Sequence, residues 1–221
     1  MYSKSKQVGI SIKKFTFNPF QENTYIVHDD ESCVIIDPGC YETHEKDALT
    51  SYISENDLTP MALLLTHAHI DHILGCSFIL STYSVDFYMH ELDMETLRSV
   101  SGYAHLYGFP GYAPPTEPNK FLEDGQKLSF GKIEFDVRFT PGHAPGHVVF
   151  YNKESNSVIN GDVLFQGSFG RVDLPGGDLA TLKESIHTIM FELPENTIVY
   201  CGHGPETTIG AEKRSNYILQ H

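Results

Sequence analysis

The sequence predicts an α+β fold, a four-layer α/β/β/α sandwich in which helices cover the outer faces of two packed sheets. Two observations lead to this prediction. Strand-like segments open the chain and return from residue 126, and each strand-rich stretch is followed by an amphipathic helix. With 221 residues and 40% hydrophobic content, the chain is long enough to fill one core, so we expect a single domain over residues 1–221.

The first half is expected to begin with an antiparallel meander. Residues 9–17 alternate between apolar and polar side chains, and strand-like residues return at 24–27 and 33–39, on either side of a DDES turn. The spacing predicts an amphipathic helix over Glu45–Glu55, and the apolar run MALLLT predicts a buried strand that ends directly before His67. Further along we expect a helix over 71–84, a strand over 85–89 and a helix over 91–100.

The middle of the chain contains a segment without periodicity, residues 102–119, with four prolines, three glycines and three tyrosines. This composition predicts an ordered loop, and loops of this length in compact proteins often act as lids. Beyond the loop the strand pattern returns. We expect strands over 126–131, 132–140, 147–152, 157–161 and 196–201, and a helix over 179–193.

Charge and composition narrow the possible partners. Fifteen basic against 29 acidic residues give a formal net charge of −14, which disfavours binding to nucleic acid or to an anionic membrane. The first fifteen residues lack the apolar centre of a secretory signal, and the longest aliphatic run, MALLL, is too short to cross a bilayer. The four cysteines form no C-x-x-C pair, so we expect free thiols in a cytoplasmic protein that acts on a small molecule.

The strongest functional signal is the sequence T-H-A-H-I-D-H, from Thr66 to His72, directly after the predicted buried strand. Imidazole and carboxylate groups are common ligands of zinc and related metals, and four of them within six residues are difficult to explain as core packing. In an extended loop His67 and His69 would point the same way, while Asp71 and His72 could turn toward a second ion. The motif therefore predicts that one loop serves two metals.

Three more residues of ligand type each follow a hydrophobic strand: His143, Asp162 and His203. Strand ends that meet at one edge of a sandwich would bring these side chains to the histidine loop. A glycine stands beside each of the three, which allows the backbone to pass close to a crowded site. We therefore expect a two-metal centre built from seven side chains, namely His67, His69, Asp71, His72, His143, Asp162 and His203.

These residues, in this order, resemble the signature of the metallo-β-lactamase superfamily: an Asp, then H-x-H-x-D-H, a His, a bridging Asp and a last His. The resemblance extends from NPFQENTYIV to CGHGPETTIG and implies the sandwich fold of that family. It also implies that Asp37 orients the histidine loop, and His147 is expected to hydrogen bond near the ligands rather than to bind metal. The implied ligands are His67, His69 and His143 for metal one, Asp71, His72 and His203 for metal two, and Asp162 for both.

Within this superfamily the segments TPGHAPGH, GDVLF and CGHGPET are most similar to the glyoxalase-II-like branch, the hydroxyacylglutathione hydrolases. The similarity implies a short, single-domain member without the additional C-terminal helical region of glyoxalase II itself. The expected substrate is a thioester such as an acylglutathione, or a conjugate of another thiol. It would be cleaved by a hydroxide held between two divalent ions, with Asp71 and Asp162 at the catalytic centre.

Arg171 is the candidate for substrate binding. It stands where the glyoxalase II pattern has a lysine for the thiol carrier, so the resemblance implies that its guanidinium group holds a carboxylate of the substrate. The alternative is a surface ion pair with Asp173 or Asp178.

Two other activities stay open. The segment GSFGRVDLPGGD is also similar to the persulfide dioxygenase branch, and a member of that branch would use iron at metal one only. Another small-molecule ester or lactone hydrolase would use the same ligands. The ligand set contains no soft sulfur group, so zinc is the expected metal, with iron and manganese as alternatives.

Overall fold

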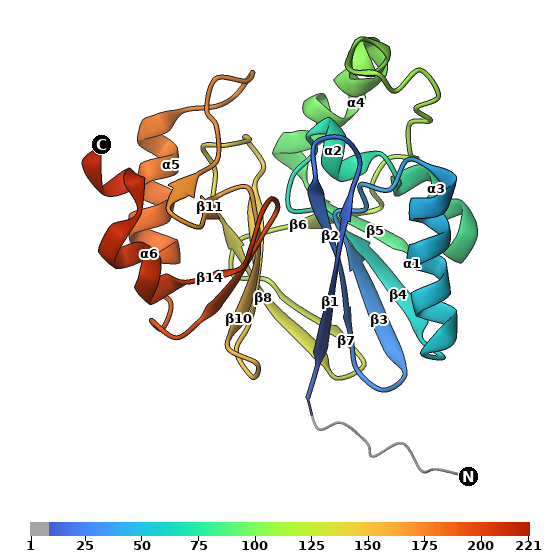
Figure 1. Ribbon diagram of the computed structural model, residues 1–221, viewed down its shortest axis with the longest axis horizontal. Coiled ribbons are helices and arrows are strands. Elements are labelled where there is room, and N and C mark those ends of the chain that lie inside the picture. The colour runs from blue at the N-terminus through green and yellow to red at the C-terminus, as the bar shows by residue number, and fades with distance from the viewer. Residues whose placement is uncertain (1–8) are drawn as a thin grey trace.

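The computed structural model describes residues 9–221, so the first eight residues of the segment assessed for a secretory signal lie outside the described range. Two six-stranded sheets face each other at the centre of the molecule, and helices cover both outer faces (Figure 1). In residues 9–221, no helix is long and apolar enough to span a lipid bilayer. The four predicted layers are therefore present.

The first sheet keeps its strands in chain order. Its first three strands form the predicted antiparallel meander, and the remaining pairs are parallel. Because parallel strands end at the same edge, the loops that follow β4 and β5 leave the sheet on one side. The strands are β1 (Ser11–Phe17), β2 (Glu22–His28), β3 (Ser32–Ile36), β4 (Thr59–Leu64), β5 (Asp86–His90) and β6 (Lys120–Leu122).

The second sheet has the order β14-β13-β10-β9-β8-β7, and only its β10–β13 pair is parallel. That parallel pair brings the ends of two distant strands to one edge. The strands are β7 (Lys127–Phe130), β8 (Ile133–Phe139), β9 (Val148–Asn152), β10 (Ser157–Gly161), β13 (Ile198–Cys201) and β14 (Thr207–Thr208), and β11 (Leu164–Phe165) with β12 (Ser168–Phe169) forms a separate hairpin.

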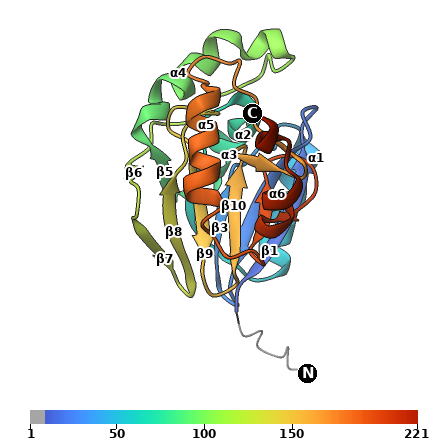
Figure 2. The ribbon, with the colours of Figure 1, turned by 90° about the vertical axis from the view of Figure 1, so that its left-hand side faces the viewer.

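Helices cover the outer face of each sheet. Figure 2 shows α5 and α6 in front of the second sheet, and α1 and α3 lie on the outer side of the first sheet, at the right of Figure 1. The α-helices are α1 (Thr43–Glu55), α2 (Ile70–Ile73), α3 (Cys76–Tyr83), α4 (Met94–Tyr103), α5 (Leu179–Ser185) and α6 (Ile209–Ser215). The 3₁₀ turns are η1 (Glu91–Asp93), η2 (Ala104–Tyr107) and η4 (Tyr217–Gln220), and η3 (Ile186–Met190) is a π-helical turn.

Alternating side chains on the strands separate three apolar clusters. Leu63 of β4 packs toward the helices of the first sheet, whereas its neighbours Ala62 and Leu64 pack between the two sheets. In the same way Phe150 of β9 faces the first sheet and Val149 faces α5. All of these side chains are fully buried. Both faces of each sheet are therefore covered, which is why these strands have apolar residues at successive positions.

The helix predicted over 71–84 is interrupted, and this prediction was wrong at Gly75. The Gly75 N–H donates to the carbonyl of Pro38 at 2.7 Å, and the carbonyl of Asp71 accepts from Asn18 Nδ2 at 3.1 Å. These two contacts replace the hydrogen bond that a continuous helix would make between residues 71 and 75. A side chain at Gly75 would also collide with Cys40 Sγ. The break therefore ends α2 directly after the last ligand of the histidine loop.

The segment 102–119 is less irregular than its composition predicts. Helix α4 continues to Tyr103, η2 follows, and the chain enters an open loop only at Gly108, which has a positive φ of 90°. The short elements β6, β11, β12, β14 and α6 have no clear sequence signal. Each is shorter than the windows over which periodicity can be recognised.

Candidate metal centre

The seven predicted ligands lie together at one edge of the sandwich, the end at which α2 stands in Figure 1. The loop after β4 is joined to the start of β9 by Val148 N–H donating to Thr66 O at 2.9 Å. The ends of β10 and β13 are joined by Gly202 N–H donating to Gly161 O at 2.7 Å. The strand ends therefore converge at this edge, as the sequence predicts.

The first group of ligand atoms comes from His67, His69 and His143. His143 Nε2 lies 3.3 Å from His67 Nε2 and 2.8 Å from His69 Nδ1. Burial, together with the nearby imidazoles, lowers the pKa of His67 well below its usual value and that of His69 to about 3. Burial also lowers the pKa of His143. Three neutral rings thus direct lone pairs at one point, and such a group could hold a metal ion.

In two histidines of this group, the ring nitrogen that points away from the shared site has a polar contact with the protein. His143 Nδ1–H donates to the carbonyl of Arg171 at 2.7 Å, which leaves Nε2 free to accept. His67 Nδ1 lies 3.0 Å from Thr66 Oγ1. Fixing one nitrogen of an imidazole selects the tautomer and the ring orientation that a metal ligand requires.

The second group consists of Asp71, His72 and His203. His203 Nε2 lies 3.2 Å from Asp71 Oδ2, and His72 Nε2 lies 3.8 Å from the same oxygen. Burial disfavours charge on these rings, yet the carboxylates of Asp162 and Asp71 raise the pKa of His72 and raise that of His203 to about 10. Carboxylates that draw protons onto a buried and a partly exposed imidazole create a site that favours positive charge, which a divalent cation would supply.

Asp162 lies between the two groups. Its Oδ2 is 3.6 Å from His143 Nε2 and 3.4 Å from His203 Nε2, and its Oδ1 is 3.5 Å from His72 Nε2. Burial raises its pKa, but the charge of His72 and the contact with His203 outweigh burial and hold the pKa well below the usual value. Asp162 therefore touches both groups, as the predicted bridge requires.

Two buried atoms show that these residues fit a cation. Among residues 9–221, neither His72 Nε2 nor Asp162 Oδ1 has a hydrogen-bond partner, although each is buried. Leaving polar atoms unsatisfied in a protein interior is costly. A metal ion coordinated by these atoms would remove that cost.

Asp37 and His147 form hydrogen bonds with the ligand-bearing segments: Asp37 with His72, and His147 with the backbone of Asp162. Asp37 accepts from Thr66 N at 2.7 Å and Thr66 Oγ1 at 2.5 Å, and its Oδ2 lies 3.2 Å from His72 Nδ1. His147 Nε2 accepts from the Asp162 N–H at 3.1 Å and is therefore directed at backbone. The contacts agree with the supporting roles expected for both residues.

Arg171 is at the surface. Its guanidinium group forms two hydrogen bonds of 2.7 Å with Asp173, and both side chains are more than 60% exposed. This is the ion pair left open as the alternative, and substrate binding by Arg171 stays a prediction. Its backbone has a separate function, because the Arg171 carbonyl orients His143.

Several buried polar residues beside the ligands were not found from the sequence. Asn23 Nδ2 donates to the carbonyls of Cys201 and Gly204 at 3.0 and 2.8 Å, and so fixes the turn that carries His203. Glu22 is fully buried, and burial raises its pKa; its Oε1 lies 3.9 Å from His72 Nδ1. Both residues lie in the segment NPFQENTYIV, where nothing but the family resemblance pointed to the site.

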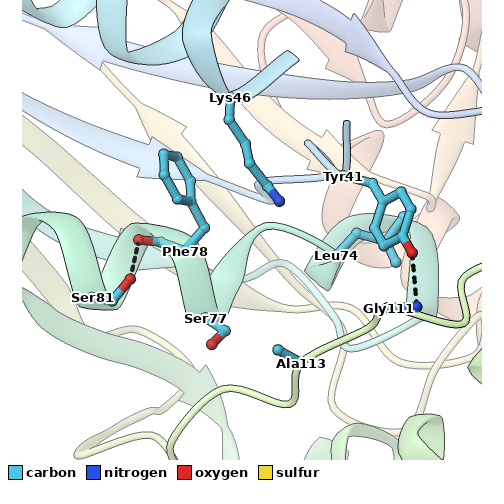
Figure 3. A pocket seen from close by; sticks show the side chains of 8 residues that line it. All are labelled: Tyr41, Lys46, Leu74, Ser77, Phe78, Ser81, Gly111 and Ala113. Carbon is cyan, nitrogen blue, oxygen red and sulfur yellow. Dashed lines mark hydrogen bonds between the residues drawn. The ribbon is translucent and has the colours of Figure 1, made fainter. Parts of the chain in front are cut away.

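The loop after η2 is fixed by aromatic contacts. The ring of Phe20 lies 6.2 Å from that of Tyr107 and 6.0 Å from that of Phe109, and Phe109 packs edge-on against Tyr41 at 4.9 Å. The Gly111 N–H donates to Tyr41 Oη at 2.9 Å (Figure 3). A cavity of about 180 Å³ lies beside this hydrogen bond, and none of the seven ligands lines it. Its lining residues are Tyr41, Lys46, Leu74, Ser77, Phe78, Ser81, Gly111 and Ala113.

The sequence profile described as the metallo-β-lactamase superfamily matches residues 17–203, which include all seven ligands. The chain belongs to this superfamily. The predicted sandwich is thus confirmed as a metallo-β-lactamase fold.

Curated relatives of this superfamily member match over almost their full length. This chain is 40% identical to the probable metallo-hydrolase YqgX of Bacillus subtilis, over 94% of this chain and 96% of the relative. It is 37% identical to the hydroxyacylglutathione hydrolase GloC of Haemophilus influenzae, over 95% of this chain and 98% of the relative. These relatives support an enzyme of the metallo-hydrolase type.

Two solved structures of the same fold resemble the chain closely. BLEG-1, a B3 metallo-β-lactamase, superposes with a TM-score of 0.86 at 40% identity, covering 96% of this chain and 100% of BLEG-1. TTHA1623 in a di-iron-bound form superposes with a TM-score of 0.84 at 38% identity, covering 94% of this chain and 100% of that one. TTHA1623 holds two irons in that structure, and the histidine-rich ligand groups of this chain, in the same fold, imply divalent metals.

Proposed function

We propose that this superfamily member is a hydrolase with a two-metal centre that cleaves a thioester such as an acylglutathione. The observation that carries the proposal is the position of Asp162, whose two oxygens reach His143, His203 and His72. A carboxylate placed between two complete groups of ligands suits a pair of ions rather than a single one. The relative named as a hydroxyacylglutathione hydrolase supports the thioester.

Each ligand group has its own task in this proposal. The histidines His67, His69 and His143 hold metal one, Asp71, His72 and His203 hold metal two, and Asp162 binds both. When bound, the ions would activate water and polarise the thioester carbonyl. A thiolate leaves readily, so the site does not need a strong general acid. Zinc is the first expectation, and the di-iron form of TTHA1623 supports iron as the alternative.

The substrate would approach from the side of metal two. Of the metal-two ligands, His203 and Asp71 have side chains that are 28% and 14% exposed, whereas the metal-one ligands His67, His69 and His143 are all buried. Asp71 and Asp162 would position the reacting groups. Arg171 would exchange Asp173 for a carboxylate of the thiol carrier. The four cysteines are buried and unpaired, which supports a reducing, cytoplasmic environment.

A persulfide dioxygenase is the second candidate. It would use iron at His67, His69 and His143 and leave the second group without a catalytic role. Neutral imidazoles are good ligands for iron as well as zinc, and the di-iron neighbour shows that this fold accepts iron.

One set of measurements separates these activities. Metal content is determined on protein purified without added metal, and thiol release from a hydroxyacylglutathione is compared with oxygen uptake on glutathione persulfide. The proposal expects two metals per chain and thioester hydrolysis that is lost in Asp162→Ala. One iron per chain with oxygen uptake would establish the dioxygenase instead. A β-lactam belongs in the same assay because of the likeness to BLEG-1, and faster cleavage of the lactam would overturn the thioester assignment.

A further inference from the structure

Asp93 is a buried carboxylate that the proposed chemistry does not use. It is the last residue of η1 and occupies the N-cap position of α4, but its side chain makes no capping hydrogen bond to that helix. Aspartate at this position usually accepts from the first turn of its own helix. The carboxylate of Asp93 is fully buried and makes its contacts elsewhere.

Those contacts connect the two loops that carry metal one. Asp93 Oδ2 accepts from the N–H of Ala68 at 2.9 Å, and Ala68 stands between His67 and His69. Asp93 Oδ1 accepts from the N–H of Gly146 at 2.6 Å, in the loop that begins with His143. One carboxylate therefore fixes, relative to each other, the two backbone loops that carry His67, His69 and His143.

Gly146 packs closely against Asp93. A Cβ atom added at Gly146 would lie 2.7 Å from the Asp93 nitrogen and 2.9 Å from Oδ1, so a side chain at 146 would push the two loops apart. Burial raises the pKa of Asp93 to about 6, and the two backbone N–H donors act against that rise.

We propose that Asp93 is a positioning residue for metal one, whose two hydrogen bonds set the separation of the His67–His69 loop from His143. This inference rests on the two-metal centre of the proposed function. It predicts that Asp93 acts on metal one far more than on metal two, because His72 is oriented by Asp37 and His203 by the carbonyl of Phe20.

The test measures zinc affinity at each site separately. Asp93→Asn keeps the size of the side chain but places an NH₂ group against one of two N–H donors, so one contact becomes repulsive. Asp93→Asn is combined with His203→Ala, so that zinc binding is measured at metal one, and separately with His69→Ala, so that it is measured at metal two. Competition with a chromophoric chelator should show a loss of roughly tenfold or more at metal one and a much smaller loss at metal two.

The matched control is Asp29→Asn. Asp29 is also buried and accepts three backbone N–H bonds, but it joins turns that precede β3 and β8, away from the ligands. It should lower thermal stability without changing zinc affinity. The Co²⁺ absorption spectrum of metal one should shift in Asp93→Asn and not in Asp29→Asn.

Three outcomes are decisive. Unchanged zinc affinity in Asp93→Asn, or an equal loss at both sites, would overturn the positioning role. If Asp93→Asn does not fold, Gly146→Ala tests the same contact from the other loop and should give the same selective loss of zinc affinity at metal one. Unchanged affinity, or an equal loss at the two metal sites, would again overturn the positioning role. If the unaltered protein binds no zinc, the proposed function and this inference both fail; if it binds zinc but cleaves no thioester, the proposed function fails and the selective loss at metal one still decides this inference.

Discussion

His203 Nδ1–H donates to the backbone carbonyl of Phe20 at 3.1 Å, across 183 residues of sequence. Phe20 therefore has two contacts with different roles. Its main-chain carbonyl orients His203, the last ligand, and its ring packs against Tyr107 and Phe109 of η2 and the loop that follows. The two functions can be separated, because a change of side chain at position 20 leaves the carbonyl in place.

Phe20→Ala should leave metal content unchanged and weaken substrate binding. The loss of the ring removes the contacts with Tyr107 and Phe109 that hold the loop beside the open side of the site. We expect KM for the thioester to rise several-fold while kcat changes little, as measured by steady-state kinetics. Ile198→Ala is the control, because Ile198 is equally exposed at 40% but lies at the start of β13, remote from the ligands. A loss of metal in Phe20→Ala would show that the ring, and not the carbonyl, orients His203.

Asp162→Ala and His203→Ala should differ in metal content. Asp162 contacts both ligand groups, so its removal should disturb both metals, whereas His203 belongs to the group at metal two. Metal analysis after dialysis against buffered zinc should give close to one ion per chain for His203→Ala and less for Asp162→Ala. Equal, full occupancy in the two variants would contradict the ligand assignment.

Arg171→Ala tests the thiol carrier. Two charge-assisted hydrogen bonds to a substrate carboxylate contribute enough that we expect KM for an acylglutathione to rise roughly tenfold. KM for a thioester of an uncharged thiol should stay the same, and thermal stability should not change because the pair with Asp173 is exposed. Arg98→Ala is the matched control, since Arg98 makes a similar exposed pair with Glu117. Equal effects on both substrates would assign Arg171 to the surface pair alone.

Asp29 should make the fold sensitive to acid. Burial disfavours its charge, but N–H groups of Ser32, Glu31 and Lys132 outweigh burial and lower its pKa. A lowered folded pKa stabilises the fold above the unfolded value near 3.9, and this contribution is lost as the pH falls through the folded pKa. Asp29→Asn should therefore cost about 1–3 kcal/mol at pH 7, from an unpaired buried donor, and less at pH 3.

Urea unfolding of the metal-free proteins at the two pH values measures this difference. Metal is removed because proton competition at the ligands would add its own pH dependence. A difference between Asp29→Asn and the unaltered protein that stays constant from pH 7 to pH 3 would show that the carboxylate charge is not what matters.

The strand-end positions of the ligands explain how much of the site could be predicted. Each of His143, Asp162 and His203 follows an apolar run, and such runs identify strands from local sequence alone. Residues that act through long-range hydrogen bonds leave no local pattern. Asp93 has the appearance of an ordinary helix cap, and its true partners, Ala68 and Gly146, lie 25 and 53 residues away.

The fold shows the same division. The long strands and α1 were found because their periodicity is local, and the sandwich followed from their order. The break at Gly75 could not be found, because its cause is the carbonyl of Pro38 and the sulfur of Cys40 from another segment. The fate of Arg171 could not be decided from sequence either, because Asp173 and a substrate carboxylate offer it the same chemistry.

The hydrogen bonds between the segment after β1 and the turn after β13 have a consequence for biosynthesis. Glu22 pairs with His203, and Asn23 donates through its backbone N–H to the carbonyl of Gly202 and through Nδ2 to the carbonyl of Gly204, so these two segments of the sandwich close on each other. A ribosome releases residues 67 to 143 well before residue 203. The nascent chain can therefore gather the three histidines of one ion early, while the pocket for the other ion waits until residue 203 has been synthesised.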